Sequence, residues 1–203
     1  MKLLRRALAW LVILTTWVGL GIAQTDAHSS VEQALDVWQS REVAHEKVAA
    51  LGREGVAELL KIAVDDSQHL KIRWHAVTLL PTFHRGNPEV LPALESILTK
   101  AKPSTYRCFA LHSLSQIGRE ALPVVVEALD DNSVCMQSTV THTGTFDVYV
   151  SDEAVRILEK LTGRTLEEDQ PVWKKPHRNA DLWRVWWREN RQKYCDLPIT
   201  GCA

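Results

Sequence analysis

The chain has 203 residues, of which 45% are hydrophobic and 24% are charged, and this composition suits one globular domain with a sizeable core. Its formal net charge of −1 gives no general reason to expect nucleic-acid binding. With only 9 glycines and 8 prolines, we expect no long disordered segment.

The first 23 residues have the composition of a secretory signal. Cations between positions 2 and 6 precede an uncharged run over residues 7–23, which ends in small residues around Ala23. We predict a cleaved signal peptide over 1–23 and a mature protein in the periplasm or outside the cell. The alternative is an uncleaved anchor in the inner membrane, although 17 residues are few for crossing a bilayer. A membrane is an expected partner only in that case.

Four segments of the chain share an alanine followed by apolar residues four and seven positions later, which marks one face of a helix. Successive alanines are 32, 34 and 44 residues apart. The four sets are Ala44/Val48/Leu51, Ala76/Leu80/Phe83, Ala110/Leu114/Ile117 and Ala154/Leu158/Leu161. This recurrence predicts four equivalent helices.

A second apolar set follows each of the first three helices. It lies 12, 15, 16 and 19 residues after the alanine in repeats one and three, and two residues later in repeat two, after a turn with Gly86 and Pro88. Each unit is therefore predicted to be two antiparallel helices, and such units must stack to bury their apolar faces. The predicted fold is an all-α α-solenoid of about four helix pairs over residues 24–166.

The segments "IRWHA" and "YRCFALHSLSQIGREALPVVVEALDD" carry a family resemblance. They resemble HEAT-like repeats of the short kind first described in phycobilin lyases. The ending, "LTGR" followed by "DLWRVWWREN", is similar to the tail of many exported bacterial HEAT-repeat proteins. The resemblance implies the fold and carries no activity over, because repeat folds serve many functions.

An insertion over residues 131–150 separates the third and fourth repeats. It is rich in Thr, Val, Phe and Tyr around Thr143-Gly144, which predicts a short β-hairpin. Insertions in solenoids gather on one face, often the binding face. His142, Asp147 and Tyr149 in this loop are therefore candidate partner-binding residues.

Four cysteines in an exported chain are disulfide candidates, and four allow three pairings. Cys108 lies in the first turn of a first helix and Cys135 just past the end of the following helix, so the two ends should meet. Cys195 and Cys202 bracket a short loop containing Pro and Gly. We predict 108–135 and 195–202.

The sequence contains no complete motif for catalysis, phosphate binding or zinc binding. "HEKVA" lacks the second histidine of a zinc site, and neither a phosphate-binding nor a nucleophile-elbow motif is present. No catalytic residue, metal ligand or cofactor is predicted. Arg41, Arg73 and Arg107 each lie three residues before a repeat alanine. We expect them to pair with an aspartate such as Asp66, and the alternative is a basic stripe for an anionic ligand.

Residues 167–203 are predicted to be a linker and a tryptophan-rich helix. Asp181 is the expected N-cap, and Trp183, Trp186 and Trp187 fall on one face of the helix. We expect them to cap the last repeat, with their indole N–H groups reaching water or backbone. The alternative is an exposed platform for a sugar or a partner. Arg184 and Arg188 are further candidates for partner binding.

These features together predict a non-enzymatic exported scaffold that binds an unidentified protein, and no nucleic acid, through its solenoid surface. Two alternatives remain open. One is an accessory enzyme or lyase-like factor with its site in the 131–150 insertion. The other is an envelope interaction protein anchored in the membrane.

Overall fold

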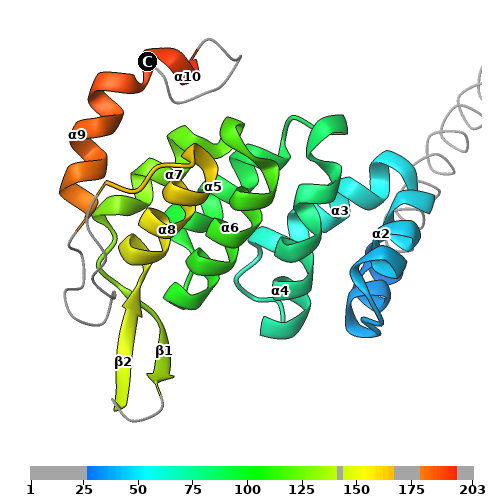
Figure 1. Cartoon of the computed structure of the whole chain (residues 1–203). Coiled ribbons are helices and arrows are strands. Elements are labelled where there is room, and N and C mark those ends of the chain that lie inside the picture. The colour runs from blue at the N-terminus through cyan, green and yellow to red at the C-terminus, as the bar shows by residue number, and fades with distance from the viewer. Residues whose placement is uncertain (1–26, 141–143, 167–178, 196–203) are drawn as a thin grey trace, which may run out of the picture.

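The computed structural model describes residues 27–140, 144–166 and 179–195. The fold is an all-α solenoid with one inserted hairpin (Figure 1). The helices of the predicted repeats are α2 Arg41–Ala50, α3 Gly52–Val64, α4 Leu70–Leu79, α5 Val90–Lys100, α6 Ser104–Ile117, α7 Leu122–Glu127 and α8 Val150–Thr162. Short 3₁₀ turns join them: η1 Leu80–Gly86, η2 Arg119–Ala121 and η3 Ala128–Asp130. The hairpin strands are β1 Val134–Val140 and β2 Gly144–Tyr149, and the chain continues to α9 Ala180–Asn190 and α10 Gln192–Cys195.

The four repeat alanines hold the first helices close together. Ala44, Ala76, Ala110 and Ala154 are all buried, as are the aliphatic residues four positions later. The first helices α4, α6 and α8 pack side by side in one layer, which the missing side-chain bulk of alanine permits. In the second layer, α3 packs on α5 and α7 packs on α9. The predicted helix-pair repeat is confirmed.

The N-terminal end of the array differs from the regular pattern. Residues 27–36 form a helix that the repeat pattern does not predict. It covers the start of the array, since Leu35 O lies 2.6 Å from His75 Nδ1 of α4 and His28 lies 2.5 Å from Glu58 of α3. These contacts bury the first face of the solenoid, which would otherwise expose its core.

Helix α9 takes the position of a second helix in the fourth repeat. It packs on α7, on η3 and on α8, and Trp183 and Trp186 are buried there while Trp187 is half-buried. The predicted cap is therefore present. Its predicted start is wrong: the N-cap is Asn179, and Asp181 lies in the first turn, where it pairs with Arg184 at 2.5 Å.

The expectation for the indole N–H groups is also wrong. Within the described residues, Nε1 of Trp183 and Nε1 of Trp186 are buried without a hydrogen-bond partner. The two rings meet edge to face, 5.1 Å apart between centroids, and pack as apolar side chains. Hydrophobic and ring–ring contact therefore outweighs the unpaired donors at this position.

Candidate interaction surface

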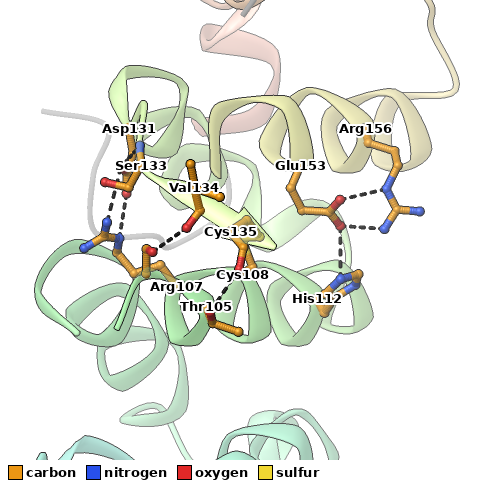
Figure 2. The surroundings of a disulfide bond; sticks show 11 residues. Thr105, Arg107, Cys108, His112, Asp131, Ser133, Val134, Cys135, Glu153 and Arg156 are labelled. Carbon is orange, nitrogen blue, oxygen red and sulfur yellow. Dashed lines mark hydrogen bonds and ion pairs between the residues drawn. A yellow bond between two sulfur atoms is a disulfide. The ribbon is translucent and has the colours of Figure 1, made fainter. Parts of the chain in front are cut away.

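The inserted hairpin is fixed to the first turns of α6. Ser104 Oγ donates to Val134 O at 2.5 Å, and Thr105 Oγ1 donates to Cys135 O at 2.9 Å. The predicted disulfide between Cys108 and Cys135 is present, with 6.0 Å between the Cα atoms (Figure 2). The base of the hairpin is therefore as rigidly placed as the helix that carries it.

A β-bulge explains how Cys135 reaches the helix. Val134 pairs with Tyr149 and Met136 with Val148, so β1 has one residue more than β2 at this point. The extra residue is Cys135, and a bulge of this kind redirects a side chain out of the regular alternation. Cys202, the predicted disulfide partner of Cys195, lies outside the described residues.

The arginine ladder is structural at two of its three positions. Arg73, almost fully buried, pairs with Asp66 at 2.7 Å and donates from Nε to Ala63 O. Arg107 pairs with Asp131 at 2.7 Å, at the base of the hairpin. Arg41 departs from the ladder and donates to Gln116 at 2.5 Å. Arg73 and Arg107 are thus committed to contacts within the chain.

A polar network joins α6 and α8 beside the hairpin. Glu153 is buried and accepts two hydrogen bonds from Arg156, at 2.5 and 3.0 Å, while His112 Nε2 lies 3.2 Å away (Figure 2). The Glu153 carboxylate raises the pKa of Arg156 through these hydrogen bonds. A histidine oriented by a carboxylate is one part of a catalytic site. Here the nearby Ser115 hydroxyl donates to the carbonyl of its own helix, at His112 O.

The other described histidines are also engaged in packing or capping. His69 caps α4, His84 pairs with Glu120 at 2.8 Å, and His45 stacks on Phe83. In the described part of the chain, no three His, Cys, Asp or Glu side chains gather closely enough to hold a metal ion. Over the same residues, no helix is long and apolar enough to cross a membrane.

Apolar side chains are exposed along the edge of the array where the first helices begin and from which the hairpin projects, which we call the hairpin edge (Figure 1). Among the described residues, six of the eight large apolar side chains that are exposed lie on the hairpin or near the ends of helices that meet at this edge. They are Val37, Val64, Leu70, Trp74, Val134 and Met136. The remaining two, Leu182 and Val185, lie on α9.

Trp74 forms the centre of a group that we call the aromatic patch: Trp38, Leu70, Trp74 and Phe109. Trp74 is 42% exposed, and its ring lies 5.7 Å from that of Phe109 on α6. Trp38 joins the patch through the buried ring of His75, on which it stacks at 4.4 Å. Leu70 lies one turn before Trp74 on the same face of α4.

The patch rests on a fixed base. Tyr106 is buried under it, and its hydroxyl donates to Leu70 O. The guanidinium of Arg73 lies 4.4 Å from the centre of the Tyr106 ring, a cation–π contact. Burial raises the pKa of Tyr106, and the nearby Arg73 opposes this in part. The exposed ring of Trp74 and the half-buried rings of Trp38 and Phe109 therefore lie on a packed base.

The predicted partner-binding candidates that the structure describes lie on two different elements, β2 and α9. Asp147 and Tyr149 lie on one face of β2, where Asp147 accepts from Gln137 at 3.0 Å, whereas His142 lies outside the described residues. Arg184 uses its guanidinium within the chain, on Asp130 and on Leu129 O, both at 2.6 Å. Arg188 is exposed on α9.

Part of the repeat array matches a known family of helical repeats. Residues 56–140, from α3 to β1, match the family model of HEAT repeats. The chain contains HEAT-like repeats. No curated protein and no solved structure matches the chain. The HEAT-like match covers Leu70, Trp74 and Phe109 of the aromatic patch together with Arg73 and Arg107, whereas Trp38 precedes it, and the match ends within the hairpin.

Proposed function

We propose that this chain is a non-enzymatic exported scaffold that binds another protein through the hairpin edge of its HEAT-like array. The aromatic patch is the observation that carries the proposal. Clustered apolar side chains that stay exposed on a rigid surface are typical of protein-binding sites, and tryptophan contributes more than most residues to such contacts. HEAT-like arrays present extended surfaces of this kind.

The hairpin extends the proposed surface beyond the helices. Its base lies on α6 next to the patch, and Val134 and Met136 are exposed on β1. Because the disulfide and the two hydroxyl contacts fix this base, little conformational freedom would be lost when a partner binds. Rigid apolar contacts beside a fixed loop favour one defined partner rather than general adhesion.

Export is proposed on two grounds. The signal-like residues 1–23 predict it, and the buried disulfide supports it, because stable disulfides are typical of oxidising compartments. The scaffold role requires no cofactor, and nothing in the proposal involves nucleic acid.

Site-specific photo-cross-linking in the native host tests the proposal. A photoreactive phenylalanine analogue replaces Trp74, and in a matched protein it replaces Val185, which is 44% exposed on α9. We expect one discrete adduct of higher mass from position 74 and none from position 185. Adducts of equal yield at both positions, or no adduct at position 74, would contradict a binding surface at the patch.

A further inference from the structure

A second surface lies at the opposite end of the first helices, where each chain turn leads into the second helix. We call it the turn edge: the turns at residues 51–53, 84–89 and 117–121. A hollow of about 730 Å³ lies between the first two turns, and a second of about 410 Å³ lies between the next two. Both hollows are lined by Gly86, Asn87 and Pro88, so they adjoin.

The turns of this edge are held in place by local contacts. Asn87 Oδ1 accepts from Glu89 N at 2.9 Å, which fixes the turn between the hollows. Phe83 lines the first hollow and is stacked on His45, with 4.7 Å between ring centres. Gly52 has φ of +63°, a conformation that other residues rarely adopt. The hollows are therefore preformed features of the edge.

Unpaired arginines follow the same edge. Arg53 lines the first hollow and Arg85 the second, and both are exposed. No acid of the described residues forms an ion pair with Arg53 or Arg85. Arg73 and Arg107, by contrast, are both paired with an aspartate near the starts of the first helices. Each hollow also has one acid in its lining: Glu89 in the first, and Glu120, which pairs with His84, in the second. Recognition would thus depend on each guanidinium fork rather than on a general positive field.

We infer that the turn edge binds an extended acidic segment of another protein. Arg53 and Arg85 would each grip a carboxylate, for which a guanidinium offers two parallel donors. An apolar side chain between the two acids would enter the first hollow, against Val56 and Phe83. The first hollow combines apolar side chains, Val56 and Phe83, with one arginine and one glutamate, and this lining fits a peptide better than a free phosphate.

The repeat spacing sets the spacing of the acids. Packed helices lie about 8–10 Å apart, and an extended peptide advances about 3.3 Å per residue. Successive arginines would therefore meet every third residue of the segment. The inference shares with the proposed function only the class of partner, because it uses a different surface.

Fluorescence anisotropy tests the inference with a labelled peptide, Asp-Leu-Ser-Asp-Leu-Ser-Asp, and the purified chain. We expect saturable binding below about 1 mM. The Arg53→Glu, Arg85→Glu double variant should bind at least about tenfold more weakly. The matched control, Lys100→Glu with Lys102→Glu, makes the same charge change at exposed residues of the opposite end and should bind as the wild type does.

Peptide variants and a second protein variant separate the two elements of the site. Replacing each Asp of the peptide by Asn, or each Leu by Ser, should weaken binding. Ala57→Glu places a carboxylate in the lining of the first hollow and should have the same effect. No saturable binding below about 1 mM, or an equal loss in the lysine control, would overturn the inference. Trp74→Ser should leave peptide binding unchanged, so failure here does not affect the cross-linking result at position 74.

Discussion

Replacing Trp183 by alanine should destabilise the protein by about 3 kcal/mol. The side chain is 0% exposed, and burial of an aromatic residue removes about 150–250 Å² from water, worth about 4–6 kcal/mol at 25 cal/mol per Å². The unpaired indole N–H offsets about 1–3 kcal/mol of this. The result lies at the lower end of the roughly 3–5 kcal/mol measured for such truncations.

Trp183→Phe is the matched control for this prediction. It keeps most of the apolar ring and removes the unpaired donor, so we expect a stability within about 1 kcal/mol of the wild type. Urea denaturation followed by circular dichroism measures both variants, with the slope unchanged if the transition stays cooperative. A wild-type midpoint for the alanine variant would refute the buried-cap argument and favour the platform for a sugar or partner.

Three further perturbations test separate parts of the structure. Cys135→Ser opens a cross-link that spans 27 residues, which should lower the free energy of unfolding by about 3–4 kcal/mol; the wild type melted in reductant should match the variant. Arg73→Met should lose about 1–3 kcal/mol in urea denaturation, because it removes the buried partner of Asp66. Glu127→Gln should raise the melting temperature at pH 7 and leave it unchanged below about pH 4, because partial desolvation and the nearby Glu95 raise the pKa of Glu127 and so disfavour its charged form in the folded state. A lower melting temperature at pH 7 would contradict this sign.

The stacked repeats could be predicted because their spacing has a physical cause. An alanine at Ala76 or Ala110 is required where two helices cross closely, and the aliphatic residues that follow must face the same core. The disulfide followed from the same register, since it placed Cys108 in the first turn of one helix and Cys135 just past the end of the next. Its dependence on a β-bulge could not be predicted, because a bulge arises from strand pairing rather than from composition.

The N-terminal helix was missed although its pattern is present. Val31, Ala34, Leu35 and Trp38 have the spacing of one helical face, and the first three are buried. Ala34 has no Arg three residues before it and no apolar residue seven residues after it, so a search for the repeat pattern does not find the segment. The start of α9 was displaced for a different reason: Asn179 and Asp181 are both good capping residues, and sequence alone does not rank them.

The aromatic patch has its origin in one position of the repeat. Trp74 and Cys108 both lie two residues before the repeat alanine, so they occupy equivalent places on α4 and α6. In the third repeat the hairpin covers this place, through the bond between Cys108 and Cys135. In the second repeat no described element covers it, and Trp74 stays 42% exposed. A tryptophan at this place could be identified from the sequence, but its exposure depends on how far the hairpin reaches. The insertion thus protects one repeat and leaves its neighbour accessible, which places the proposed binding surface at the border between them.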